Sequence, residues 1–164
     1  MNKRGLLLFS IIFLSVIIQT TILPVYIVPQ FKPDLLLICT VYLALRSPSV
    51  PAGAFLAWIL GLLKDVFSAL YFGMNAFSFL LIYLFIKHIA DRLYAESPLL
   101  FVITITLAGF ASVTLNFLLL LMFDQSSGIF YSMSAGLIPH LLVNAFAASL
   151  VGLIPKFDRG QETA

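Results

Sequence analysis

Long runs without any charged side chain are the feature that most constrains this chain. Only sixteen of its 164 residues are Asp, Glu, Lys or Arg, and 62% are apolar. Average globular domains are about 45–50% apolar and about 25% charged, so this composition excludes an ordinary soluble fold. A helix that crosses a bilayer needs about 20 mostly apolar residues. The charge-free runs that approach or exceed this length are residues 5–31, 47–63, 66–86, 97–123 and 125–155.

Prolines and short polar connections divide these runs into six expected membrane spans. Proline cannot continue a helix, and prolines between residues 24 and 33 and between residues 48 and 51 separate the first three spans. None of the connections is long enough to fold separately. We therefore expect an all-α integral membrane protein, with a single transmembrane domain over residues 1–164 and no soluble domain. The expected spans are residues 5–23, 34–45, 52–70, 74–89, 98–123 and 129–154.

The positions of Lys and Arg predict that both termini lie in the cytoplasm, because cytoplasmic loops carry an excess of basic residues. With six crossings, only Lys32 and Lys64 would lie outside. The basic residues that would lie inside are Lys3, Arg4, Arg46, Lys87, Arg92, Lys156 and Arg159. A rival arrangement makes residues 34–45 and 52–63 a re-entrant hairpin, with Arg46 held deep in the membrane at a cost of about 2.5–3.5 kcal/mol. We prefer two full crossings.

Small residues recur every four positions in the third expected span. The stripe consists of Gly53, Ala57, Gly61 and Asp65, which lie on one face of a helix. Small residues at this spacing let two helix backbones approach closely within a membrane. Two interpretations follow. The stripe is either an internal packing surface of the bundle or a docking surface for a partner helix.

Lys64 and Asp65 are adjacent in sequence, so on a helix they point about 100° apart and do not pair with each other. One interpretation is a solvated pair at the outer membrane boundary, where long side chains reach the headgroups. The other is that Asp65 faces the bundle or a partner and is held by hydrogen bonds from other helices. We regard Asp65 as the best single candidate for a functional residue.

Polar side chains also lie deep in the last two expected spans. Asn116 lies in the fifth span, and Asn144 follows His140 by one helical turn in the sixth, beside Pro139. Such residues usually form hydrogen bonds between helices. The alternative is a proton or solute path, for which one histidine and two asparagines are few groups.

Motifs of enzymes and metal sites are absent from the sequence. It has no H-E-x-x-H, no C-x-x-C and no Gly-rich phosphate loop, and it has two histidines in all. The single cysteine, Cys39, excludes a disulfide framework. The small excess of basic residues does not indicate a nucleic-acid partner. We expect a protein that is not an enzyme and that uses no cofactor or metal.

Several short motifs resemble one family of membrane proteins. Residues 31–37 read FKPDLLL and residues 41–46 read VYLALR. The spacing G-x(7)-G-x(3)-D of the stripe leads into a Gly-Met-Asn-Ala turn at residues 73–76. Together with the size, the basic start and the six-span plan, these motifs resemble the MreD family of bacterial rod-shape-determining membrane proteins.

The resemblance implies a non-enzymatic scaffold of the cell-elongation (rod) complex in the bacterial cytoplasmic membrane. Members of the family associate with MreC, with MreB filaments, and with RodA and its penicillin-binding transpeptidase partner. The family is also similar in fold to the substrate-binding subunits of energy-coupling-factor transporters. That similarity gives an alternative function, a subunit of a small-molecule (vitamin-type) transporter. Such subunits typically carry an Ala-rich motif in the first helix, whereas residues 5–23 contain no alanine, so we prefer the scaffold.

The resemblance also suggests where partners would bind. The stripe in the third span would contact helices of MreC or of the synthase. A charged cluster in the fourth connection would face the cytoplasm and meet an MreB filament or anionic lipid, unless it is simply a solvated loop. This cluster consists of Lys87, His88, Asp91, Arg92 and Glu96.

Overall fold

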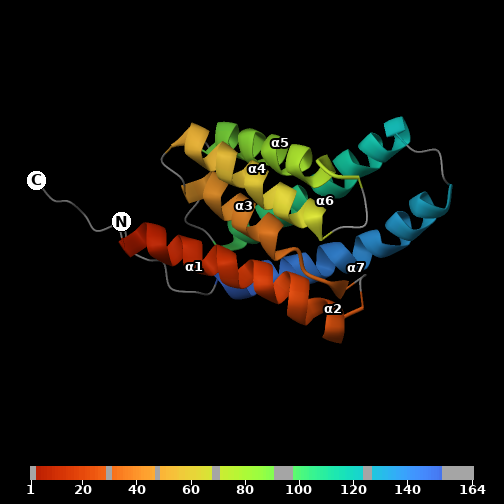
Figure 1. Cartoon of the computed structure of the whole chain (residues 1–164), viewed down its shortest axis with the longest axis horizontal. Helices are drawn as coiled ribbons and strands as arrows, with labels where there is room; N and C mark the ends of the chain where they lie inside the picture. The colour runs from red at the N-terminus through yellow and green to blue at the C-terminus, as the bar shows by residue number, and fades with distance from the viewer. Residues whose placement is uncertain are drawn as a thin grey trace, which may run out of the picture.

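The computed structural model describes residues 3–28, 31–46, 49–67, 71–90, 98–123 and 127–152. All regular secondary structure within these ranges is helical, which confirms the expected all-α fold for this part of the chain. The elements are α1 (Lys3–Ile17), the π-helix η1 (Ile18–Ile22), α2 (Leu23–Tyr26), α3 (Leu35–Arg46), α4 (Val50–Val66), α5 (Met74–Ala90), α6 (Pro98–Phe123) and α7 (Ser127–Gly152). The first three follow one another without a break and form one continuous rod (Figure 1).

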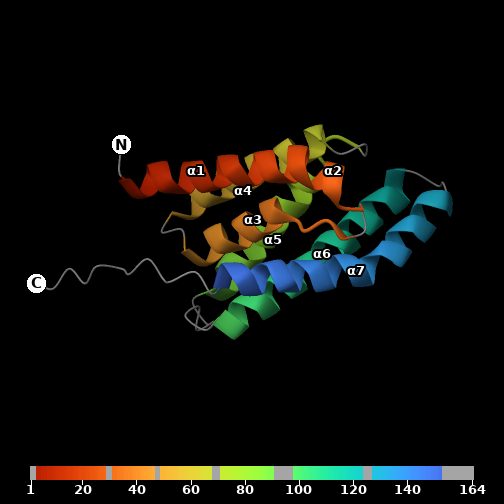
Figure 2. The ribbon, with the colours of Figure 1, turned by 90° about the horizontal axis from the view of Figure 1, so that it is seen from below.

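Successive rods run in opposite directions along one axis (Figure 1). The view turned by 90° in Figure 2 shows the same alternation. One end of the bundle, here called the α2 end, gathers α2, the start of α3, the end of α4 and the start of α5. The start of α1 and the end of α7 both lie toward the opposite end. This up-and-down arrangement is the one that short connections between helices favour.

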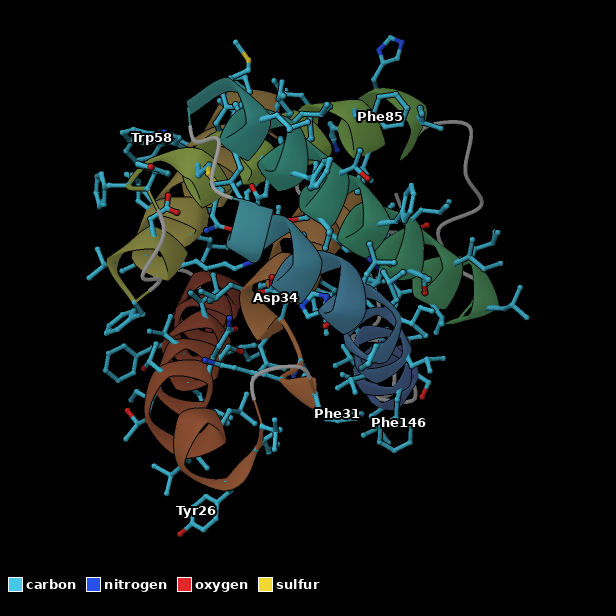
Figure 3. The ribbon with its side chains drawn as sticks, turned by 90° about the vertical axis from the view of Figure 1, so that its right-hand side faces the viewer. Tyr26, Phe31, Asp34, Trp58, Phe85 and Phe146 are labelled. Carbon is cyan, nitrogen blue, oxygen red and sulfur yellow. The ribbon has the colours of Figure 1, made fainter. Side chains whose placement is uncertain are left out.

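The short helix α3 lies at the centre of the bundle, as the end-on view in Figure 3 shows. It contacts α1, α4, α5, α6 and α7, and a helix surrounded in this way must be apolar on most of its circumference. Its buried side chains are Leu36, Leu37, Ile38, Thr40, Val41, Leu43 and Ala44. With 12 residues, α3 is about 18 Å long. The first N–H groups of any helix have no partner within the helix. Because α3 lies inside the bundle, neighbouring helices or side chains have to provide partners for these groups.

The first rod continues past its expected end at residue 23, because η1 accommodates a proline. Pro24 has no N–H group, and in a regular helix its ring would clash with the carbonyl of Thr20, four residues earlier. In η1 the backbone N–H of Leu23 instead donates to the carbonyl of Ile18, five residues earlier. The wider turn accompanies a buried Gln19, which is only 6% exposed. Such π turns often mark functional positions.

The outer surface is apolar on every long helix. Each of α1, α4, α5, α6 and α7 carries a phenylalanine that is more than half exposed, namely Phe13, Phe55, Phe85, Phe110 and Phe146. Soluble monomers rarely expose contiguous apolar surface on this scale, so the surface is suited to lipid or to partner helices. Within the described residues, Leu99–Met122 of α6 is long and apolar enough to cross a membrane by itself. Shorter apolar helical segments are Ser10–Ile22, Leu35–Arg46, Met74–Ile89 and Gly136–Val151.

Candidate functional site

The stripe of small residues on α4 lies inside the bundle, against α5. Its members Gly53, Ala57, Gly61 and Asp65 are all buried. A Cβ atom on Gly61 would lie 2.6 Å from the carbonyl oxygen of Asn75 on α5, and a Cβ atom on Gly53 would overlap the ring of Tyr83. The stripe thus lets the backbones of α4 and α5 approach closely. This is the first of the two interpretations of the stripe, an internal packing surface of the bundle. A partner helix could reach this face only if α4 and α5 separated.

Asp65, at the end of the stripe, caps α5. One carboxylate oxygen accepts the backbone N–H groups of Gly73 and Ala76, at 3.0 and 3.1 Å. The other accepts the backbone N–H and the side-chain amide of Asn75, at 3.0 and 2.8 Å. These donors belong to the start of a helix, which leaves N–H groups unpaired and favours a negative charge. Asp65 therefore faces the bundle and is not a solvated boundary residue.

The turn that Asp65 caps also explains where α4 ends. The expected third span reached residue 70, whereas α4 ends at Val66; residues 68–70 lie outside the described ones. Gly73 has a φ of +97°, a conformation that glycine adopts at little steric cost. The chain thus reverses over a few residues, and α5 starts where the Asp65 carboxylate can reach its first turn.

The hydrogen bonds of Asp65 continue into α6. Asn75, already bonded to Asp65, accepts a hydrogen bond from the side-chain amide of Asn116 at 3.1 Å. The hydroxyl of Ser78 donates to the side-chain oxygen of Asn116 at 2.7 Å. All of these side chains are buried. This Asp65 network (Asp65, Asn75, Ser78 and Asn116) joins α4, α5 and α6.

A second network centres on Asp34, which the sequence analysis noted only as the start of a span. One of its carboxylate oxygens accepts the side-chain amide of Gln19 and the backbone N–H of Leu37, both at 3.2 Å. The other accepts the ammonium of Lys64 at 2.5 Å. Asp34 is thus the N-cap of α3. Gln19 completes the cap, because its side-chain oxygen accepts the N–H of Leu36 at 3.0 Å.

Asp34 and Lys64 form a partly buried ion pair between α3 and α4. Their side chains are 3% and 23% exposed. Burying two charges is costly unless further hydrogen bonds satisfy them, and the donors on Asp34 meet that need. The Lys64 ammonium also lies 5.0 Å from the centre of the Phe79 ring on α5, within the range of a cation–π interaction.

The expected polar residues of α6 and α7 belong to different networks. Asn116 lies in the Asp65 network, whereas Asn144 accepts the backbone N–H of Asp34 at 2.7 Å. The amide nitrogen of Asn144 lies 3.2 Å from Nδ1 of His140, one turn earlier on α7. We call Gln19, Asp34, Lys64, His140 and Asn144 the Asp34 network. It joins η1, α3, α4 and α7.

A pocket of about 230 Å³ opens beside the Asp34 network at the α2 end. Figure 3 faces this end and shows Asp34 near the middle of the bundle. Three charged side chains line the pocket, namely Lys32, Asp34 and Lys64. The other residues of its wall are Gln19, Thr20, Pro33, Leu36, Phe67 and His140.

Lys32 differs from Lys64 in its surroundings. Partial burial lowers the pKa of the Lys32 ammonium below its ordinary value, while Asp34 opposes this shift and Lys64 adds to it. Among the residues that the structure describes, Lys32 has no hydrogen bond or ion pair. It is therefore the one cation of the pocket wall without a direct counter-ion there.

The charged cluster expected in the cytoplasmic loop is described only in part. Lys87 and His88 lie in the last turn of α5, at the end of the bundle opposite the pocket. His88 is exposed and Lys87 is half-buried. Asp91, Arg92 and Glu96 lie outside the described residues.

The sequence contains a signal for the Asp34 network in the depth of three polar residues. In a six-span topology the end of span one, the start of span two and the end of span three meet at one membrane surface. Gln19, Asp34 and Lys64 are among the polar residues at those three positions. An acid and a base at the same depth in neighbouring spans are expected to pair, because unpaired charges in a membrane are costly.

The described residues include no group of three or more His, Cys, Asp or Glu side chains that could hold a metal ion. The buried polar side chains of the two networks bond across helices, and the helices expose many large apolar side chains. An apolar exterior around polar groups that bond to one another inside the bundle is characteristic of helical membrane proteins. The fold therefore belongs to this class of protein.

The comparison with protein families gives this bundle a more specific assignment. A family model described as rod shape-determining protein MreD matches residues 1–157 of the 164. The chain therefore belongs to the MreD family, and it is a bacterial membrane protein with a role in rod-shape determination. No curated protein and no solved structure matches the chain. The expected similarity to energy-coupling-factor transporter subunits thus gains no support.

Proposed function

We propose that this MreD family member is a non-enzymatic scaffold of the rod complex. It would hold MreC, RodA and the penicillin-binding transpeptidase in one assembly and connect them, directly or through MreC, to MreB filaments. Family membership over residues 1–157 is the observation that carries this proposal.

The geometry supports a scaffold in a second way. The two polar networks bond helices of the chain to one another, so their side chains are engaged in holding the bundle together. What the bundle offers to other proteins is mainly its exposed apolar surface, on α1, α4, α5, α6 and α7. Because the stripe on α4 is covered by α5, we assign partner contacts to these exposed faces in place of the stripe.

The same proposal includes six crossings of the cytoplasmic membrane with both termini inside. The alternating direction of the helices supports it, and so does the distribution of basic residues. Lys32 and Lys64 lie at the α2 end, whereas Lys3, Arg46 and Lys87 lie at the opposite end. The end of α3 and the start of α4 lie toward the same end of the bundle as the start of α1 (Figure 1), which supports full crossings by α3 and α4.

Site-specific photocrosslinking tests the scaffold. A photoreactive phenylalanine analogue is placed at Phe85 on α5 or at Phe146 on α7, which are 68% and 65% exposed and point outward in Figure 3. We expect at least one of these positions to form a product with MreC, RodA or the transpeptidase in growing cells. The products are identified by mass spectrometry after purification in mild detergent.

Phe79 provides the matched control, because it lies on the same helix as Phe85 and is fully buried. The analogue at Phe79 should give no crosslink to another protein. The same experiment is extended to exposed positions on all five apolar helices, using variants that still restore rod shape to the cells. The scaffold proposal is contradicted if none of these positions crosslinks to a protein of the rod complex.

A further inference from the structure

The pocket at the α2 end has a net positive lining. Its charged wall residues are Lys32, Asp34 and Lys64, and Asp34 is paired with Lys64. Both carboxylate oxygens of Asp34 already accept hydrogen bonds. Lys32 therefore adds a positive charge that the described wall does not neutralise. A cavity lined by one excess charge concentrates ligands of the opposite sign.

The pocket wall also offers N–H hydrogen-bond donors that are not bonded to other groups in the described part of the protein. The ammonium of Lys64 has three N–H donors, and one of them is bonded to Asp34. His140 and Gln19 contribute further polar groups to the wall. The ligand that fits such a wall is an anion with several acceptor oxygens, and the phosphate group has this chemistry.

The surroundings of the pocket are those of a membrane surface. Tyr26 is 82% exposed and points away from the bundle at this end (Figure 3). Phe31 and Phe67 are also exposed, and Phe67 is part of the pocket wall. Tyrosine is enriched where a membrane protein meets the headgroup layer, and the exposed phenylalanines add apolar surface beside it. An anion in this pocket could therefore be attached to a lipid whose chains cover the adjacent apolar surface.

The size of the pocket limits what enters it. Sites for drug-sized ligands measure about 300–1,000 Å³, whereas this cavity is about 230 Å³. It has room for a phosphate with a small substituent and excludes a whole lipid molecule. Any acyl chains would have to lie outside, along the helices.

We propose that the pocket binds a phosphate anion, carried by a lipid headgroup or by a small soluble compound, with Lys32 as its ion-pair partner and Lys64 as a second donor. Lys64 remains bonded to Asp34 in this complex, so the Asp34 network fixes one side of the site. The binding does not depend on the scaffold function, and either can fail without the other.

Binding is measured on the purified full-length protein in zwitterionic detergent. The probes are phosphatidylglycerol, phosphatidylcholine and inorganic phosphate. Their binding is detected by native mass spectrometry and by the shift of the thermal unfolding midpoint of the protein. We expect phosphatidylglycerol to bind more tightly than phosphatidylcholine. Lys32→Gln should weaken the binding of phosphatidylglycerol by about fivefold, as expected for one basic residue near a membrane surface.

Two further variants make the test specific. Lys32→Arg keeps the charge and should retain binding, which separates a loss of charge from a loss of folding. Arg46→Gln removes a positive charge from the opposite end of α3 and should leave binding unchanged. If inorganic phosphate alone stabilises the wild type but not Lys32→Gln, the site is supported and its ligand is a soluble compound. If only the lipid does so, the headgroup is the ligand.

The proposal is overturned if Lys32→Gln binds phosphatidylglycerol and phosphate as the wild type does. It is equally overturned if Lys32→Gln and Arg46→Gln weaken binding to the same extent, because the effect would then be a general attraction of the charged protein to anionic lipid.

Discussion

At the scale of single residues, two aspartates perform related tasks with different partners. Each carboxylate caps the start of a helix, Asp34 that of α3 and Asp65 that of α5. Among the described residues, the hydrogen bonds of Asp65 come from uncharged N–H donors, whereas Asp34 also has the cation Lys64. The two residues should therefore respond differently to the loss of their charge, and Asp34 should be the more sensitive.

The first prediction concerns Asp34→Asn, which keeps the size of the side chain and removes its charge. Lys64 would lose its counter-ion at a position where its side chain is only 23% exposed. Removing one partner of a buried pair typically costs about 3–5 kcal/mol. Because Lys64 is partly exposed, we expect a loss of about 3 kcal/mol in the free energy of unfolding in detergent, measured by chemical denaturation.

A double-mutant cycle provides the control for this prediction. Lys64→Met removes the cation and keeps an apolar side chain of similar length. If the ion pair is the cause, the double variant Asp34→Asn/Lys64→Met should be less destabilised than the sum of the two single variants. Purely additive losses would show that the pair does not couple α3 to α4.

At the scale of helices, the sequence was sufficient to predict most of the elements but not their contacts. Charge-free runs and prolines predicted helices near α3 to α7, because the absence of charge over about 20 residues leaves few alternatives. The extension of the first rod past Pro24 was missed, since proline normally ends a helix and the π turn that accommodates it has no sequence signature of its own.

The candidate site was predicted only in fragments for a related reason. Four-residue spacing showed that Gly61 and Asp65 share a face, but periodicity does not say which helix covers that face. Asp34 has partners 15, 30 and 110 residues away in sequence, namely Gln19, Lys64 and Asn144. Contacts across such separations depend on how the helices pack, which a single sequence does not specify.

The second prediction compares two glycines in helix interiors. Replacing glycine by alanine there favours the helix by about 1 kcal/mol. At Gly61 the new Cβ would lie 2.6 Å from the carbonyl oxygen of Asn75, so backbone would have to move. At Gly109 the nearest atom would be a methyl carbon of Leu141 at 3.2 Å, on a side chain that can shift slightly.

We therefore expect Gly61→Ala to lower the free energy of unfolding by about 1–3 kcal/mol, the usual cost of overpacking. Gly109→Ala should be close to neutral, because the gain in helix propensity offsets the smaller contact. Both are measured by thermal unfolding in the same detergent. Equal stability of the two variants would contradict the close packing of α4 on α5.

At the scale of the whole molecule, the bundle has chemically different ends. The α2 end holds the pocket, both capped helix starts and the exposed aromatic side chains Tyr26 and Phe67. The opposite end holds Arg46, Lys87 and His88. Since basic residues concentrate on the cytoplasmic side of a membrane, we expect the pocket to face the outer side, as the proposed orientation requires. Orientation in the membrane thus decides whether the pocket is reached from the cytoplasm or from outside.

The last prediction tests that orientation with single cysteines introduced into a Cys39→Ala background. Cys39 is the only cysteine, so every signal comes from the introduced thiol. A membrane-impermeant reagent applied to intact cells with a permeable outer envelope should label Gln30→Cys and Ser126→Cys, which fall in the sequence between α2 and α3 and between α6 and α7. Ser49→Cys, between α3 and α4, should be labelled only after the membrane is dissolved in detergent.

Labelling of position 49 in intact cells would contradict six crossings with the termini inside and would favour a re-entrant hairpin or an inverted bundle. Labelling of position 49 together with protection of positions 30 and 126 would place the pocket on the cytoplasmic side, where its phosphate ligand would have to come from the inner leaflet or the cytosol.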